Sequence, residues 1–217
     1  MNGVQLEARQ AAAVIAALGW VSLLLQLFVA WLNAANFGGT GLIAIWRVFG
    51  FFTILTNLMA AIALTMSALD RWPGWMPPKS WVLGGLAVHM LIVAVVYHVV
   101  LAGLWNPKGL HWVADQGLHS IVPALLALYW FFFAPKAGLS YRDAGVWLVY
   151  PLCYFVYAML RGTREGWYPY PFLDVGVLGY FRVIANALVI TVVMYLFSLG
   201  LVALARQITG EGARDRF

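Results

Sequence analysis

Charged residues and cysteine are scarce in this sequence. Only 10% of its 217 residues are charged, whereas about 25% is usual for a soluble domain. Because Cys153 is the single cysteine, the chain has no intrachain disulfide and no tandem-cysteine metal or redox site. Cys153 lies inside an apolar run. This composition excludes a soluble enzyme, a disordered chain and a nucleic-acid binder with a basic face.

Hydrophobic residues are abundant instead and make up 64% of the chain. A soluble fold of this size could not bury so many, but a bilayer would solvate them. Six apolar runs are long enough to cross roughly 30 Å of hydrocarbon as helices of about 20 residues. They cover residues 11–35, 47–69, 81–105, 116–135, 144–161 and 178–206. Because backbone polar groups in lipid need internal partners, the sequence predicts an all-α polytopic membrane protein with six transmembrane helices in one domain, 1–217.

The formal net charge of +5 lies mostly in short loops and chain ends, where it indicates orientation. The side that holds both termini has Arg9, Arg71, Lys79, Lys136, Arg142, Arg206, Arg214 and Arg216. The other side has Arg47, Lys108, Arg161 and Arg164. Cytoplasmic loops carry the excess of Lys and Arg, so we expect both termini in the cytoplasm, with the protein in the cell's inner (plasma) membrane. The long connections 36–46 and 162–179 then face outward.

Polar residues from four predicted helices and one outer loop are expected at similar depth. Counted from the outer ends of their helices, Thr53 lies roughly 9 Å deep, His119 roughly 6 Å and His98 roughly 10 Å. Arg161 ends the fifth span, and Asp174 just precedes the sixth. Polar residues inside membrane spans are costly and are functional candidates by default, so we interpret this set as a candidate site.

Local spacing adds support around two of these positions. Asp115 lies one helical turn before His119 and is placed to orient its ring. Pro123 cannot donate to the carbonyl of His119, so that turn should be distorted. Thr53 and Asn57 are four residues apart and share a helix face.

Each candidate also has a purely structural interpretation. A threonine in a membrane helix usually bonds a backbone carbonyl, and a lone histidine is often an interhelical hydrogen-bond partner. Arg161 can snorkel to the interface, and Asp174 can cap the sixth helix. Thr56 is a rival hydroxyl on the same helix as Thr53.

Three short motifs resemble the androgen-induced protein family and its bacterial six-helix relatives. They are FFTILTNL at residues 51–58, QGLHSIVP at 116–123 and EGWYPYPFLD at 165–174. Members of that family are multi-pass threonine hydrolases that cleave fatty acid esters of hydroxy fatty acids, with an essential Thr and His in the membrane. The resemblance implies that Thr53 is the nucleophile and His119 its base, and it implies no cofactor and no metal. Animal members have an acidic residue where Thr56 stands, so the chain is closer to the bacterial branch.

The resulting hypothesis is an intramembrane lipid hydrolase. His119 would take the proton of Thr53 as its hydroxyl attacks an ester carbonyl, because a threonine hydroxyl needs an adjacent base. We expect both side chains to face one largely apolar cavity, with a lipid substrate and the surrounding membrane lipids as partners. The candidates for substrate binding or support are Asn57, His98, Asp115, Ser120, Tyr154, Tyr157, Arg161, Trp167, Tyr170 and Asp174. Among them, Asn57, Ser120 and His98 are the alternatives for stabilising the oxyanion, and Arg161 for binding a carboxylate.

Two other functions stay open at this point. A lipid or small-molecule binding or transport protein would use the same polar pocket without chemistry. A membrane cytochrome would need two facing histidines as haem ligands, for which only His98 and His119 qualify.

Overall fold

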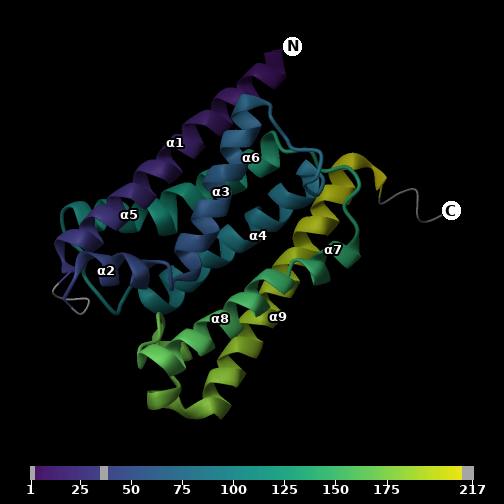
Figure 1. The fold of residues 1–217 in the computed structure, drawn as a ribbon. Coiled ribbons are helices and arrows are strands. Elements are labelled where there is room, and N and C mark those ends of the chain that lie inside the picture. Colours follow the sequence, from purple (N-terminus) through teal and green to yellow (C-terminus); the bar gives the residue numbers. More distant parts are fainter. Residues whose placement is uncertain (1–2, 35–38, 212–217) are drawn as a thin grey trace.

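The computed structural model describes residues 3–34 and 39–211, and the regular structure in these residues is entirely helical (Figure 1). Arg214, Arg216, residue 35 of the first predicted span and residues 36–38 of the first outer connection lie outside the described residues. The α-helices are α1 (Gly3–Leu32), α2 (Gly41–Val48), α3 (Phe52–Leu69), α4 (Lys79–Val96), α5 (Leu110–Gln116), α6 (Val122–Phe132), α7 (Tyr141–Val146), α8 (Val149–Glu165) and α9 (Val175–Thr209). Three short segments are the π-helical η2 (Tyr97–Leu101) and η3 (Gly117–Ile121) and the 3-10 helix η4 (Pro171–Leu173).

Five helices of the described chain are long and apolar enough to cross a membrane. They are Gly3–Leu32, Phe52–Leu69, Lys79–Leu101, Tyr141–Glu165 and Val175–Thr209. These match five of the six predicted spans. The remaining one, 116–135, is helical through α5, η3 and α6 as far as Phe132, but it is not among these five helices.

The predicted helix 47–69 is broken near its start. α2 ends at Val48, and α3 begins at Phe52 after an extended Phe51 with φ −86° and ψ 133°. The turn between them is too tight for a side chain, because a Cβ at Gly50 would lie 2.9 Å from the carbonyl oxygen of Arg47. Apolar periodicity runs through residues 49–51 without interruption, so it could not reveal this break.

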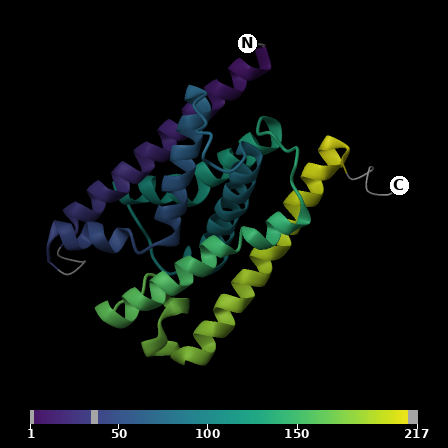
Figure 2. The same ribbon diagram turned by 45° about the vertical axis from the view of Figure 1, so that its right-hand side comes forward.

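The helices form a bundle with α8 and α9 on one side of it, as both views show (Figures 1 and 2). α1 packs along α3, and α4 packs against α3, α6 and α9. The start of α1 and the end of α9 lie at the same end of the bundle (Figures 1 and 2). That arrangement places the two described chain ends on one side of the molecule.

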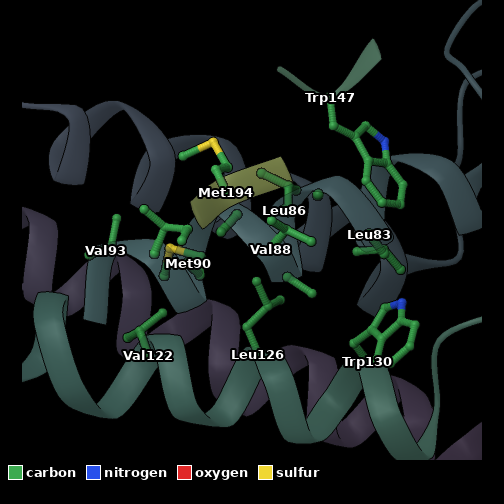
Figure 3. Close-up of a cluster of buried hydrophobic side chains, with 14 of the residues drawn as sticks. Leu83, Leu86, Val88, Met90, Val93, Val122, Leu126, Trp130, Trp147 and Met194 are labelled. Atoms are coloured by element: carbon green, nitrogen blue, oxygen red, sulfur yellow. The ribbon is translucent and has the colours of Figure 1, made fainter. Parts of the chain in front are cut away.

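α4 is the centre of the hydrophobic core. Figure 3 shows its side chains between Leu126 and Trp130 of α6 and Met194 of α9. Leu83, Val88 and Met90 of α4 are fully buried. The core thereby holds α4 rigidly between α6 and α9.

Candidate functional site

An apolar cavity of about 220 Å³ lies among α3, α4, α8, α9 and the loop before α9. The loop contributes Tyr170, Phe172 and Leu173 to its wall. Its walls are otherwise aliphatic and aromatic, with hydroxyl groups from Thr53, Tyr154, Tyr170 and Thr191. The lining residues are Phe52, Thr53, Ile92, Val93, Val96, Leu101, Pro151, Leu152, Tyr154, Phe155, Tyr170, Phe172, Leu173, Ile184, Ala187, Leu188, Ile190, Thr191 and Met194.

Thr53 lies in the first turn of α3, directly after the break, and is buried. A backbone amide in the first turn of a helix has no partner within that helix. The amide of Thr53 donates instead to the Tyr170 hydroxyl at 3.3 Å, and Thr53 Oγ1 lies 3.4 Å from the same oxygen. The second distance is long for a hydroxyl–hydroxyl bond, which is usually about 2.7–2.8 Å. The Thr53 hydroxyl is therefore only weakly bonded and is open to another partner in the cavity.

Burial also keeps the Tyr170 hydroxyl in its neutral form. Tyr170 lies in the loop outside the candidate membrane helices, and desolvation raises the pKa of its phenol above the usual value of 10.0. The phenol therefore retains its proton as a possible donor toward Thr53 or a bound ligand.

One face of α8 fixes the break that precedes Thr53. Tyr154 Oη donates to the carbonyl oxygen of Gly50 at 2.9 Å, and Tyr157 Oη donates to that of Phe49 at 3.1 Å. Arg161 Nη1 donates to the carbonyl oxygen of residue 46 at 3.2 Å. Buried carbonyl groups require such partners, so α8 stabilises the unusual start of α3.

Arg161 is occupied within the protein. Its Nε and Nη2 donate to the two carboxylate oxygens of Glu165 at 2.8 and 3.0 Å, and its guanidinium lies 4.3 Å from the ring centroid of Trp46. The Trp46 indole also donates to Glu165 at 2.9 Å. Glu165 thus binds Arg161 in the way expected from the sequence for a ligand carboxylate.

His119 belongs to a second cluster, which is built on η3. Its Nδ1 lies 3.2 Å from the carboxylate of Asp115 and 3.0 Å from the Asp115 carbonyl oxygen. Its ring stacks on Tyr97 with centroids 4.1 Å apart, and the Tyr97 hydroxyl donates to the other carboxylate oxygen of Asp115. With the Nδ1 proton assigned toward Asp115, Nε2 is left as the acceptor. Such a carboxylate–imidazole pair is suited to general base chemistry.

Both candidate histidines lie in π-helical turns. His98 is in η2 and His119 in η3, and Pro123 follows the second turn closely, where the sequence predicts a distortion. π-Helical turns occur frequently at functional sites. His98 bonds the Ala94 carbonyl oxygen through Nδ1 at 2.9 Å, and its Nε2 lies 3.3 Å from Ser120 Oγ.

Asn57 joins the two clusters. Its Nδ2 donates to the carbonyl oxygen of Thr53 at 2.9 Å and to that of Leu118 at 3.1 Å. The side chain is fully buried, and its Oδ1 has no hydrogen-bond partner among the described residues. Thr53 lines the cavity, whereas His119 is not among the lining residues. Asn57 therefore links the cavity wall to the segment that holds His119.

The other expected site residues have structural contacts. Thr56 Oγ1 bonds the Tyr150 hydroxyl at 2.9 Å. Asp174 caps α9, because its Oδ1 accepts from two backbone amides at 2.9 and 3.2 Å. The Trp167 ring packs edge-on against Phe51 with centroids 5.6 Å apart. The loop before α9 is thereby held over the start of α3.

Three residues that contact the candidate site residues were not predicted from the sequence. Glu165 follows its partner Arg161 by four residues. Gln116 precedes its partner Ser120 by four residues and accepts a hydrogen bond from Ser120 Oγ at 2.9 Å. This spacing brings side chains together on a helix and could have indicated both pairs. Tyr97 gave no such signal, because it reaches Asp115 and His119 from another helix.

No known protein family, curated protein or solved structure matches the chain. Within residues 3–34 and 39–211, no group of three or more His, Cys, Asp or Glu side chains is arranged to hold a metal ion.

Proposed function

We propose that the chain is an intramembrane lipid hydrolase that cleaves fatty acid esters, with Thr53 as nucleophile and His119 as base. The observation that carries the proposal is the weakly bonded Thr53 hydroxyl in the wall of an apolar cavity. The Asp115–His119 pair supports it, because it supplies an oriented imidazole on a segment that Asn57 ties to Thr53.

The reaction has two steps. Thr53 Oγ attacks the ester carbonyl carbon and gives its proton to His119 Nε2, which then protonates the departing alkoxide. Water cleaves the acyl-Thr53 ester, again with His119 as base, and releases the fatty acid and free Thr53. The Tyr170 hydroxyl, beside Thr53 Oγ1, is a further candidate donor to the tetrahedral oxyanion. The mechanism requires His119 to reach Thr53 directly or through one water molecule.

A lipid-binding or transport protein without chemistry is the second candidate. It is favoured by one observation: the cavity is lined by Thr53 and Tyr170 but not by His119. Thr53 and Tyr170 would then bind the polar end of a lipid that is carried rather than cleaved.

Thr53→Ala distinguishes these functions, with Thr56→Ala as a matched control. Both threonines are buried on α3, but Thr56 bonds Tyr150 and does not line the cavity. For a hydrolase, Thr53→Ala should lose both labelling by a covalent hydrolase probe and cleavage of a lipid ester, while Thr56→Ala keeps both. Lipid binding with no labelling or cleavage in any variant would support the carrier and contradict the hydrolase.

The topology is part of the proposal. We propose six crossings of the inner membrane, with the predicted span 116–135 as the fourth crossing along the chain and both termini in the cytoplasm. Reporter fusions at Lys136 and at Lys108 should then report opposite sides. Signals from the same side would contradict this topology.

A further inference from the structure

We infer that the cavity accepts a single unbranched acyl chain that enters between α8 and α9, and that Met194 limits the length of this chain. The inference rests on the proposed function for the identity of the ligand as a lipid. The entry route and the length limit follow from the shape and exposure of the cavity wall.

The cavity is elongated along the helices. α9 lines it with Ile184, Leu188, Thr191 and Met194, which recur on one helix face. At 1.5 Å per residue, the ten residues from the first to the last span about 15 Å. α4 lines the same cavity from Ile92 to Val96 and η2 continues the wall. A long and apolar space of this kind fits an extended hydrocarbon chain.

The two ends of the cavity differ in polarity. Asn186 of α9 donates to the carbonyl oxygen of Phe172 at 3.0 Å, which places the Tyr170 loop, and with it Thr53, near Ile184 at one end of the α9 lining. The opposite end is formed by Met194, which is buried. Thr191 adds no free polar group there, because its hydroxyl donates to the Ala187 carbonyl oxygen at 2.8 Å. A polar head group therefore belongs at Thr53 and the chain end at Met194.

The cavity reaches the protein surface between α8 and α9. Leu152, Ile184 and Leu188 line it and yet are 48%, 50% and 60% exposed, whereas Thr53 and Met194 are 5% and 2% exposed. α9 lies along the edge of the molecule in Figure 2. Exposed leucine and isoleucine on these apolar helices face lipid. An acyl chain can thus enter from the bilayer without crossing water.

The test measures which chain length the cavity prefers. The full chain in lipid nanodiscs is photolabelled with a diazirine-bearing fatty acid, and saturated straight-chain acids of increasing length compete. Competition should peak at one length, because a longer chain meets Met194. Met194→Ala should move the peak to acids longer by about three methylene groups, since it removes the unbranched part of the side chain. The ratio of competition by acids just shorter and just longer than the wild-type length limit should change by about tenfold.

Matched controls separate this effect from loss of stability. Met90→Ala removes the same side chain from the buried core, but Met90 does not line the cavity, so the peak should stay in place. Leu188→Trp at the mouth should weaken labelling by acids of every length. Leu196→Trp should not, because Leu196 is equally exposed at 60% but lies outside the lining.

The outcomes distinguish the inference from the function on which it rests. An unchanged peak in Met194→Ala, the same shift in Met90→Ala, or no competition at all would overturn the inference. A peak that shifts in Met194→Ala, in a protein that cleaves no ester, would refute the hydrolase and keep the inference.

Discussion

The hydroxyl of Tyr170 accepts a hydrogen bond from the backbone amide of Thr53 and also lies 3.4 Å from its side-chain hydroxyl. α3 has no side-chain cap from its own N-cap residue, Phe51. A tyrosine from the distant loop before α9 therefore supplies the hydrogen-bond acceptor for a backbone amide in the first turn of α3, and it also contacts the candidate nucleophile. The position of the loop and the state of the Thr53 hydroxyl are thus coupled.

Tyr170→Phe should change how stability depends on pH. Burial raises the pKa of Tyr170 above 10.0, so the folded state keeps the phenol proton at pH values where the unfolded state has lost it. Stability must then fall as pH rises above about 10, by about 1.4 kcal/mol per pH unit for this group. Unfolding midpoints between about pH 9 and 11 should fall less steeply in Tyr170→Phe.

Other buried tyrosines contribute to the same fall, so the informative quantity is the difference in slope from the wild type. Tyr195→Phe is a suitable control, because Tyr195 is 39% exposed on α9. Equal slopes in the wild type and Tyr170→Phe would show that the phenol is not protected by burial.

Arg161→Gln should weaken the attachment of α8 to the break before α3. The change removes the two hydrogen bonds to Glu165, the one to the Trp46 carbonyl oxygen and the one to the Tyr157 hydroxyl. Loss of charged hydrogen bonds of this kind costs about 1.5–3 kcal/mol, and the partial exposure of Glu165, 23% for its side chain, argues for the lower part of that range. Thermal unfolding in detergent would measure it, and adding Glu165→Gln should restore part of the loss. Arg164→Gln, on the exposed next turn, should leave stability unchanged. An equal loss of stability in that variant would contradict a specific role of Arg161 in attaching α8.

Gly162→Ala should displace the loop before α9. A Cβ at Gly162 would lie 1.9 Å from the ring of Tyr168, so the ring and its loop must move away from α8. Destabilisation by about 1–3 kcal/mol is expected for overpacking of this kind, together with weaker lipid labelling because the loop lines the cavity.

The control for that change is Gly145→Ala. A Cβ there meets no atom within 4 Å, and the residue is helical, so alanine should be neutral or stabilising by about 0.5–1 kcal/mol. If Gly162→Ala behaved like this control, the packing of Tyr168 on α8 would be wrong.

Local patterns in the sequence predicted what depends on neighbouring residues. The apolar runs indicated the helices, and the four-residue spacings of Asp115 with His119 and of Thr53 with Asn57 correspond to contacts in the structure. The break at Gly50 escaped prediction because an apolar turn does not interrupt an apolar run. The reach of Tyr170 to Thr53 also escaped it, because that contact depends on how the loop folds back over a distant helix.

Asp115→Asn should lower ester hydrolysis far more than it lowers stability. The carboxylate of Asp115 accepts from Tyr97 through one oxygen and lies 3.2 Å from His119 Nδ1 through the other. An asparagine has a single side-chain oxygen, so it cannot offer a separate acceptor oxygen to each partner. If Tyr97 keeps that oxygen, the amide group donates to Nδ1 and the His119 proton moves to Nε2. Nε2 could then no longer accept the Thr53 proton, and kcat should fall by about 10²–10⁴-fold with little change in KM. Tyr97→Phe keeps the carboxylate beside the imidazole and should lose much less activity. A variant Asp115→Asn that folds and hydrolyses the ester at the wild-type rate would show that the Asp115 carboxylate does not set the protonation of His119.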